Sequence, residues 1–254
     1  MTGRQERAPM PGPREDRLLG GRVRLVQPGQ GYRVAIDPVL LAAAVPARPG
    51  ENVLDLGCGV GAAALCLLAR VGELRVTGLE LDRSLVGLAA ENARLNDAGR
   101  AFDPVVGDIL RPPPRLAPGA FHHVMANPPH LPAETGRRPS DAGRAAASVE
   151  GEAKLDDWLR AALRMVCAKG TVTLVHRADR LPELMAALAG RAGEVVVFPL
   201  WPGPDAPAKR VLVRARKGVA TPARLSPGLV LHEAAGGYTA GTQAVLRDGG
   251  GLEF

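Results

Sequence analysis

An apolar run that leads into a glycine-rich turn, and then into an alanine- and leucine-rich run, restricts the fold of this chain more than any other feature. Residues 52–56 read Asn-Val-Leu-Asp-Leu, the turn contains Gly57, Gly59 and Gly61, and residues 60–71 favour a helix. Glycines allow the backbone to turn tightly and let a ligand approach without meeting a Cβ. We therefore predict a strand, a turn and a helix, which form half of a Rossmann-like α/β unit.

The acid before these glycines indicates which ligand the turn holds. Gly57, Gly59 and Ala62 also fit the dinucleotide fingerprint loosely, but that pattern alone is a weak signal. A pyrophosphate on this turn would meet the carboxylate of Asp55, and the like charges repel more strongly as the site loses water. S-adenosyl-L-methionine carries an ammonium and a sulfonium and has no phosphate, so Asp55 favours this methyl donor as the cofactor.

Two further apolar runs end in acids. Residues 75–80 end in Glu80, about 20 residues past the glycines, where such folds place a carboxylate that binds ribose hydroxyls. Residues 103–108 end in Asp108, which we expect to accept a hydrogen bond from the adenine amine of the cofactor. The alternative for each is an ordinary solvated acid at a strand-to-helix turn, and this alternative carries most weight for Asp108.

A second loop, Asn127-Pro-Pro-His130, follows the apolar run 121–126 and predicts the chemistry of the acceptor. Ligands of open α/β sheets bind at the carboxyl ends of strands, where Asn127 is expected. Pro128 and Pro129 have no N–H, so the loop offers hydrogen-bond acceptors and few donors. Asn127 and the Pro128 carbonyl would accept both hydrogens of a planar amine, while Asn127 also borders the cofactor and His130 stacks on the base. The pair of loops predicts methyl transfer to nitrogen.

Charge and composition place limits on partners and location. The formal net charge is +6; residues 1–24 hold six arginines against three acids, and residues 207–254 hold seven lysines or arginines against three acids. Basic ends around a near-neutral middle fit a phosphate-bearing partner, although arginine-rich solvated faces explain the charge equally well. The three cysteines form no C-x-x-C pair, and we find no cleavable signal, membrane span or metal-ligand cluster, which predicts a cytoplasmic protein without a metal.

Further segments surround the two loops. Residues 1–17 lack periodicity and predict a disordered leader, and residues 18–49 are expected to cover the cofactor site through Tyr32 and Asp37. Asp37 is equally well explained as a helix cap, because Pro38 and a helix-forming run follow it. Residues 131–149 are polar and charged and suit a lid that binds substrate through Arg137 and Arg138. Residues 194–198 and 210–214 predict two strands with no helix between them, hence an antiparallel pair.

The chain resembles the class I S-adenosylmethionine-dependent methyltransferases over residues 50–217. Within that class it is similar, almost end to end, to the bacterial tRNA adenine-N6 methyltransferases that modify the adenine beside the anticodon of a valine tRNA. This narrower resemblance is carried by residues 27–33 (Gln-Pro-Gly-Gln-Gly-Tyr-Arg), 37–41 (Asp-Pro-Val-Leu-Leu), 55–61, 127–130, 208–210 (Ala-Lys-Arg), 228–232 (Gly-Leu-Val-Leu-His) and 237–239 (Gly-Tyr-Thr).

The resemblance implies a seven-stranded, mostly parallel sheet with an antiparallel last strand, helices on both faces, and a C-terminal tail, residues 218–254, packed on the domain. It implies a cofactor over Asp55, Glu80 and Asp108 and a target base at residues 127–130. His130 stands where the family usually has Tyr or Phe. Lys209 and Arg210 open a strand at the rim, where they would contact RNA phosphate or be anchored to a local acid.

Other acceptors remain open at this stage. A ribosomal RNA guanine-N2 methyltransferase and a protein glutamine N5-methyltransferase would present a similar planar amine or amide. The glutamine enzymes carry a sizeable helical domain ahead of the catalytic one, whereas only about fifty residues precede the first motif in this chain. A DNA adenine methyltransferase needs an added target-reading domain, and an RNA-binding module without activity is disfavoured because both loops are intact. Nothing in the sequence specifies an oligomeric state.

Overall fold

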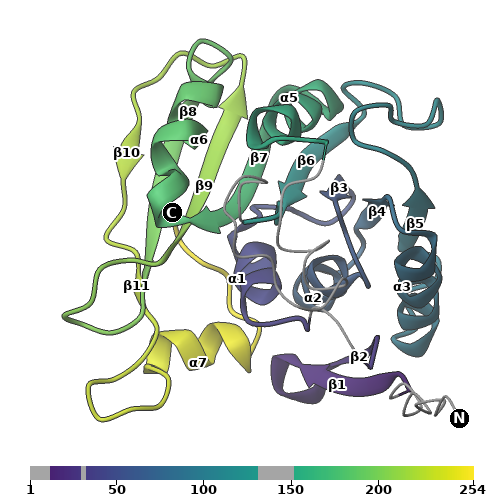
Figure 1. Cartoon of the computed structure of the whole chain (residues 1–254), viewed down its shortest axis with the longest axis horizontal. Helices are drawn as coiled ribbons and strands as arrows, with labels where there is room; N and C mark the ends of the chain where they lie inside the picture. The colour runs from purple at the N-terminus through teal and green to yellow at the C-terminus, as the bar shows by residue number, and fades with distance from the viewer. Residues whose placement is uncertain (1–11, 30–32, 131–151) are drawn as a thin grey trace, which may run out of the picture.

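The computed structural model describes residues 12–29, 33–130 and 152–254, and its centre is one twisted sheet that runs from right to left across Figure 1 in the order β5, β4, β3, β6, β7, β9, β8, β10. β11 pairs with β8 beside β10. The strands are β3 (Asn52–Leu56), β4 (Arg75–Glu80), β5 (Phe102–Val106), β6 (Phe121–Ala126), β7 (Val166–Arg177), β8 (Ala192–Trp201), β9 (Arg210–Lys217), β10 (Arg224–Leu225) and β11 (Leu229–Val230).

All of these strands run in one direction except β9, which is antiparallel to both β7 and β8. The expected α/β class, the parallel order and the reversed last strand are confirmed. β8 and β9 are joined by residues 202–209 without a helix, and a short connection of this kind requires antiparallel strands. The sheet has nine strands instead of seven because the tail adds β10 and β11, which at two residues each are too short to leave a periodic pattern.

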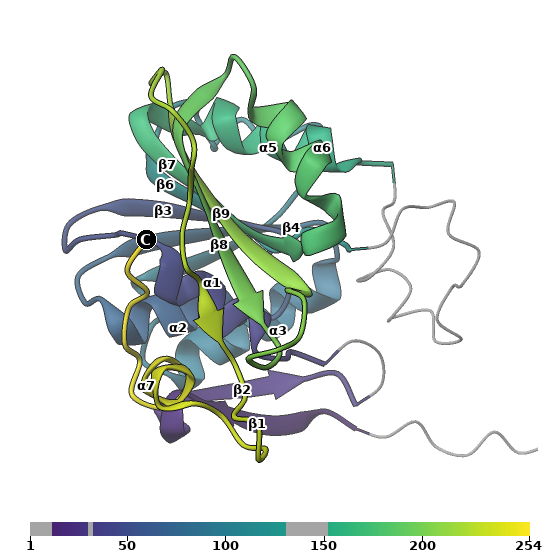
Figure 2. The ribbon, with the colours of Figure 1, turned by 90° about the vertical axis from the view of Figure 1, so that its left-hand side faces the viewer.

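Helices cover both faces of the sheet, as expected. α5 (Leu155–Met165) and α6 (Leu181–Leu188) lie above the strands in Figure 2, and α1 (Asp37–Ala44), α2 (Ala62–Arg70) and α3 (Arg83–Leu95) lie below them. Each side has its own apolar cluster, and the residues of β3 alternate between them: Val53 belongs to the lower cluster, whereas Leu54 and Leu56 belong to the upper one. By this alternation, Asp55 faces α2.

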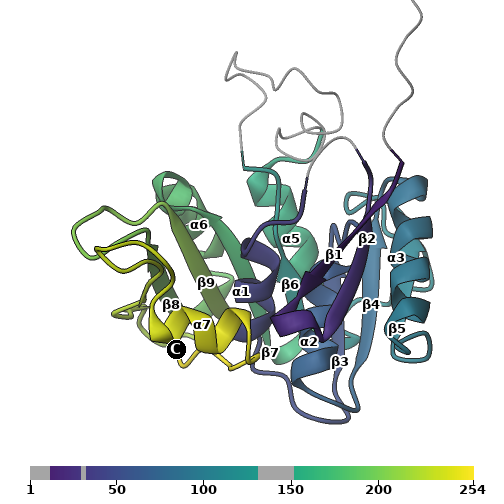
Figure 3. The same ribbon diagram turned by 90° about the horizontal axis from the view of Figure 1, so that it is seen from below.

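The amino-terminal part of the described chain is a hairpin of β1 (Arg14–Leu18) and β2 (Val23–Gln27), joined by the 3-10 turn Leu19–Gly21. Figure 3 shows the hairpin beside α3. The expected leader of residues 1–17 is therefore too long, because residues 14–17 already form a strand. The leader composition hid this strand, since most of its side chains are polar and exposed and no apolar alternation is left in the sequence.

One buried amide attaches the hairpin to the domain. Asn92 of α3 is fully buried; its Oδ1 accepts a hydrogen bond from Val26 N at 2.7 Å, and its Nδ2 donates to Val26 O and to Val60 O, each at 3.0 Å. Val60 lies in the glycine-rich turn, so this side chain holds the hairpin and the turn together. Sequence analysis did not single out Asn92.

We expect Asn92→Ala to lower the free energy of unfolding by about 3 kcal/mol, because the buried Val60 carbonyl and two partly buried backbone groups of Val26 lose their partner. Asn96→Ala is a matched control: Asn96 makes a similar pair of bonds to the backbone of Arg24, but in a partly exposed position, and it should cost about 1 kcal/mol. Urea unfolding of both variants measures the difference. Equal losses would show that Asn92 is not the main attachment.

The C-terminal tail follows the edge of the sheet and returns to the lower face. After β11 it forms α7 (Ala240–Leu246), whose N-terminus is capped by the Thr239 side chain. Leu252 N donates to Ala43 O at 2.8 Å, and the Phe254 ring stacks on Phe198 with 4.8 Å between the centroids. In the described part of the chain, no helix has both the length and the apolar character needed to cross a membrane.

Candidate functional site

The register of the sheet brings the predicted loops into one row. Leu56 at the end of β3 pairs with Ala126 of β6 on one side and with Leu79 of β4 on the other, and Glu80 pairs with Val106 of β5. The residues that follow these strand ends therefore leave the same edge of the sheet, on strands spaced about 4.8 Å apart. The glycine-rich turn, Glu80, the loop with Asp108 and the loop from Asn127 are neighbours.

The three glycines of the turn have different reasons to be glycine. All three have positive φ, +68° at Gly57, +54° at Gly59 and +87° at Gly61, which disfavours other residues. An added Cβ would lie 2.5 Å from the Trp158 ring at Gly57 and 2.5 Å from the Phe102 ring at Gly61, whereas at Gly59 it would meet no described atom within 4 Å. Gly57 and Gly61 thus allow close packing, and Gly59 alone borders open space that a ligand can enter.

Asp55 is buried beneath the turn, with 2% of its surface exposed, and its Oδ2 has no hydrogen-bond partner in the described structure. Burial and the nearby negative charge of Glu80 raise the pKa of Asp55 to about 8, although the backbone N–H of Ala64 in the first turn of α2 acts in the opposite direction. The carboxyl therefore carries a proton in most molecules at neutral pH. Our expectation of a fixed negative charge needs this correction: Asp55 becomes a lasting carboxylate only when a cation joins it.

The two other acids of the row already accept backbone hydrogen bonds. Glu80 Oε2 accepts from Gly59 N at 3.0 Å, and Oε1 accepts from Asp82 N at 2.9 Å. Asp108 Oδ1 accepts from Leu110 N at 2.9 Å. A carboxylate has about four acceptor positions, so these bonds orient each group and leave capacity for further donors.

Asn127 directly follows β6, and its side-chain Oδ1 is buried without a hydrogen-bond partner among the described residues. A buried acceptor left unpaired costs free energy, about 1–3 kcal/mol, unless a ligand supplies the donor. Pro128 and Pro129 have no N–H that could serve it. The loop thus combines an unused acceptor with a backbone that offers only carbonyl groups.

His130, the last residue of this loop, faces a charged pair. Its Nε2 lies 3.5 Å from Asp37 Oδ2, and the same oxygen lies 3.2 Å from Nε of Arg210. Burial by itself raises the pKa of the Asp37 carboxyl, but the hydrogen bond with His130 and the positive charges of Arg210 and His130 outweigh it and lower the pKa.

Asp37 and Arg210 therefore hold each other. Asp37 is the first residue of α1 but makes no side-chain cap hydrogen bond, so the helix-cap explanation is wrong. Of the two explanations offered for Arg210, anchoring to a local acid is the one that the structure contains. Lys209 is exposed beside it, and its backbone carbonyl accepts from Ala178 N at 3.2 Å.

His176, near the end of β7, is a site residue that sequence analysis missed. It is fully buried, its Nε2 lies 3.3 Å from Pro129 O, and its ring stands edge-on to His130 at 5.2 Å between centroids and 88° between planes. Burial, with the positive charge of His130, lowers the pKa of His176 to about 4, so it is neutral and donates its Nε2 hydrogen to the carbonyl. The rule that singled out Asn127, a polar residue at a strand's carboxyl end, would also have found His176.

Three predicted site residues, Tyr32, Arg137 and Arg138, lie outside the described residues.

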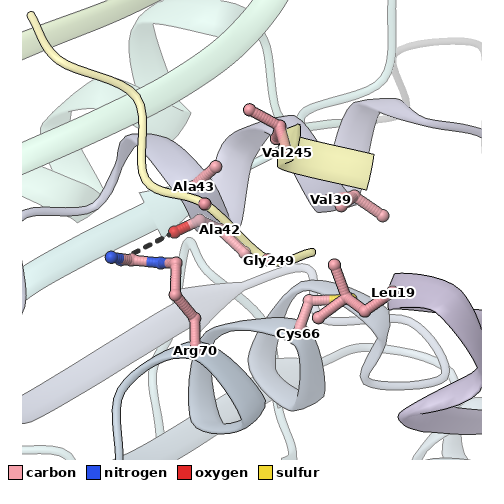
Figure 4. Close-up of a pocket in the computed structure, with 9 residues that line it drawn as sticks. Leu19, Val39, Ala42, Ala43, Cys66, Arg70, Val245 and Gly249 are labelled. Carbon is pink, nitrogen blue, oxygen red and sulfur yellow. Dashed lines mark hydrogen bonds between the residues drawn. The ribbon is translucent and has the colours of Figure 1, made fainter. Parts of the chain in front are cut away.

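A small gap in the packing lies between α1, α2, the 3-10 turn and the tail (Figure 4). At this gap, Arg70 Nη2 donates to Ala42 O at 3.0 Å. None of the loops in the row described above lines this gap. The candidate site is therefore the row at the carboxyl edge of the sheet, and the gap is a feature of the core.

Comparison with known proteins agrees with this location. The family model described as "Methyltransferase small domain" matches residues 33–138, which include the glycine-rich turn and the Asn127 loop. A relative from Porphyromonas gingivalis, named tRNA1(Val) (adenine(37)-N6)-methyltransferase, is 32% identical over 173 residues, which span 64% of this chain and 66% of that protein. A relative of the same name from Aeromonas hydrophila is 29% identical over 210 residues, or 82% of this chain and 85% of that protein.

A solved structure from Agrobacterium tumefaciens, described as a predicted O-methyltransferase, superposes with a TM-score of 0.70 at 25% identity and covers 85% of this chain and 98% of its own. With the strand order, the glycine-rich turn and the family match, these similarities identify the class. The chain belongs to the class I S-adenosylmethionine-dependent methyltransferases, and within that class it is similar to the relatives from Porphyromonas gingivalis and Aeromonas hydrophila.

Proposed function

We propose that this protein transfers the methyl group of S-adenosyl-L-methionine to the exocyclic N6 amine of an adenine in tRNA. The names of the relatives from Porphyromonas gingivalis and Aeromonas hydrophila point to this reaction. The observation that carries the proposal is that Asn127 Oδ1 has no partner among the residues that the structure describes, and this acceptor is in the position where a planar amine would arrive.

The residues of the glycine-rich turn fit the cofactor. Asp55 Oδ2 is a buried oxygen to which no described residue donates, and the cofactor's ammonium would supply a donor together with a compensating charge. Gly59 leaves space beside the turn. Glu80 would accept from the ribose hydroxyls with its remaining lone pairs, and Asp108 would accept from the adenine amine. When bound, the cofactor would supply an electrophilic methyl group, and these residues would hold it at the edge of the sheet.

The acceptor loop suits a weak amine nucleophile. The lone pair of an exocyclic base amine is delocalised into the ring, so the amine must be turned toward sp³ geometry before it can attack. Two acceptors, Asn127 Oδ1 and the Pro128 carbonyl, would bind the two N–H groups and aim the lone pair at the methyl carbon. The Pro129 carbonyl is fixed by His176, which keeps the loop in place. Alignment and placed dipoles then supply the rate enhancement.

The number of hydrogen-bond donors distinguishes an amine acceptor, which has two N–H groups, from a hydroxyl acceptor. A hydroxyl brings a single donor, which leaves one of the two carbonyl-type acceptors unpaired, and its methylation requires a base to remove the proton first. Guanine-N2 and glutamine amides bring two donors, as adenine does. The relatives' names favour adenine over these two acceptors.

RNA contact is proposed for the rim around this loop. Lys209 is exposed at the start of β9, and Arg137 and Arg138 follow the acceptor loop in sequence. Residues 18–49 would border the cofactor site of the catalytic domain, residues 50–217. A base in a flexible single-stranded loop can be unstacked and inserted, so we expect such a loop to be the target. A tRNA substrate and three free cysteines also support a cytoplasmic location.

We expect the purified protein to transfer labelled methyl groups to total tRNA and not to ribosomal RNA or protein. Nuclease digestion and mass spectrometry of the product should give N6-methyladenosine, and nucleosides from a strain without the gene should lack that modification in one tRNA. Label recovered as N2-methylguanosine from ribosomal RNA would show that the acceptor is guanine and not adenine. Label in a glutamine side chain would contradict the RNA assignment.

A further inference from the structure

The environment of His130 indicates which of its two ring nitrogens carries the hydrogen. Nε2 lies 3.5 Å from Asp37 Oδ2, and the carboxylate is ionised because its pKa is lowered by His130 and Arg210 despite burial. A carboxylate only accepts hydrogen bonds, so in the neutral ring Nε2 is protonated and Nδ1 keeps a lone pair. That Nδ1 is buried and has no partner among the described residues. His130 thus presents an unused proton acceptor next to the Asn127 loop.

Three elements hold the ring in this orientation. Asp37 of α1 faces one ring edge, and Arg210 of β9 fixes Asp37 through Nε at 3.2 Å. His176 of β7 stands perpendicular to the ring, and it is neutral because burial lowers its pKa to about 4. The neutral His176 adds no positive charge beside His130. A positive charge that forms on the His130 ring would lie 3.5 Å from the Asp37 carboxylate and would share it with Arg210.

We propose that His130 is a catalytic residue that takes up, through Nδ1, the proton that the acceptor amine loses on methylation, with Asp37 and Arg210 as positioning residues. The inference rests on the proposed function and deepens it. In the family that this chain resembles, the same place usually holds an aromatic ring without a basic nitrogen. Tyr or Phe would offer the same ring face for stacking on a base. Only histidine adds a basic nitrogen at the ring edge.

The proton balance of this step is complete. The amine nitrogen forms a bond to the methyl carbon while the bond from that carbon to sulfur breaks, and the electron pair of the broken bond stays on sulfur. The nitrogen then carries a positive charge and one surplus proton. The proton passes to Nδ1, which leaves a neutral methylated amine and an imidazolium. The imidazolium is attracted to the Asp37 carboxylate, 3.5 Å from Nε2, which also pairs with Arg210.

Single-turnover methyl transfer to tRNA, measured at saturating cofactor, tests the proposal. His130→Phe keeps an aromatic face but removes the acceptor, so we expect a rate about 100-fold lower. Asp37→Asn keeps the acceptor but loses the carboxylate that orients the ring, so its rate should fall by less than that of His130→Phe, and its His130 ring should no longer hold its hydrogen on Nε2 alone.

Controls separate this role from structural effects. His122→Phe makes the same change at the opposite end of β6, where the exposed His122 side chain accepts from Asn52 N far from the acceptor loop, and the rate should stay at the wild-type value. Free imidazole should restore part of the rate in His130→Ala, which leaves space, and none in His130→Phe. A His130→Phe enzyme as fast as the wild type would overturn the proposal and assign the stacking role.

Nuclear magnetic resonance of the histidine ring nitrogens gives a result that does not depend on tRNA. Without substrate, the His130 signals, identified by their loss in His130→Phe, should show hydrogen on Nε2 and a free lone pair on Nδ1. Hydrogen on Nδ1 instead would contradict the proposal even if methyl transfer occurs. Conversely, a wild-type protein that methylates no tRNA would overturn the proposed function and leave the tautomer result standing.

Discussion

Replacing Asn127 by alanine should lower the rate of methyl transfer by about 1,000-fold while the affinity for the cofactor changes by no more than a few-fold. The side chain's Oδ1 is a buried acceptor without a partner in the described structure, so its binding energy is available to the arriving amine. Removal of one placed polar group from a water-excluded active site typically costs a factor of 100 to 1,000 in rate. Loss of the amine's orientation adds to that cost. Single-turnover rates and cofactor titrations measure the two quantities separately.

Asn127→Asp is the matched variant for this prediction. A carboxylate keeps an oxygen in the same place and can accept from the amine, so this variant should retain far more activity than the alanine variant. Thermal unfolding should be similar for the wild type and the alanine variant, because Asn127 Oδ1 makes no hydrogen bond to a described residue that the alanine would break. Equal loss of activity in both variants would mean that the acceptor oxygen is not what the reaction requires.

Asp55→Asn should have the opposite effect, a loss of cofactor affinity of about 100-fold or more with little change in the intrinsic rate at saturation. The amide has the same shape as the carboxyl but cannot become an anion, so the cofactor's ammonium loses its buried counterion. Charge-assisted hydrogen bonds of this kind contribute about 1.5–3 kcal/mol, and the buried ammonium would remain unpaired. Isothermal titration calorimetry with S-adenosylhomocysteine, which keeps the ammonium, measures the loss.

The affinity of the wild type should depend on pH in a defined direction. Burial raises the pKa of Asp55 to about 8 in the ligand-free protein, so at pH 6 the cofactor must displace a proton. Affinity should therefore rise by up to about tenfold per pH unit until pH 8. Above that value the cofactor's own α-amino group, with an ordinary pKa of about 8, loses its charge and affinity should fall. In Asp55→Asn, the cofactor affinity should not rise between pH 6 and pH 8. A flat wild-type profile below pH 8 would contradict the linkage.

The same substitution should make the ligand-free protein more stable. Asp55 has a pKa of about 8 in the folded state and about 4 when unfolded, so the folded protein holds a proton that the unfolded chain releases. The wild type therefore loses stability as pH rises from about 4 to 8, whereas Asp55→Asn does not. At pH 8 the variant should exceed the wild type by a few kcal/mol, and at pH 4 the two should be nearly equal. An equal difference at both pH values would show that titration of Asp55 is not its cause.

Local sequence was sufficient to predict the order of the elements and both loops. The strand, glycine turn and helix at residues 52–71 depend on apolar runs and on positive φ at glycines, and these properties belong to neighbouring residues. The antiparallel pair of β8 and β9 followed from the absence of a helix between them. Wrong predictions concerned segments without such local signals, namely the polar strand Arg14–Leu18 and the two-residue strands of the tail.

Contacts between distant residues decided the rest of the site. Asp37 and Arg210 are separated by most of the chain, and only the packing of α1 on β9 brings their side chains to His130. His176 reaches the Pro129 carbonyl because β7 lies beside β6. The sequence by itself determined the chemical groups that this protein can use, since residue types and local turns are written along the chain. The tertiary structure alone decided their protonation, because burial and facing charges arise only when separate segments meet.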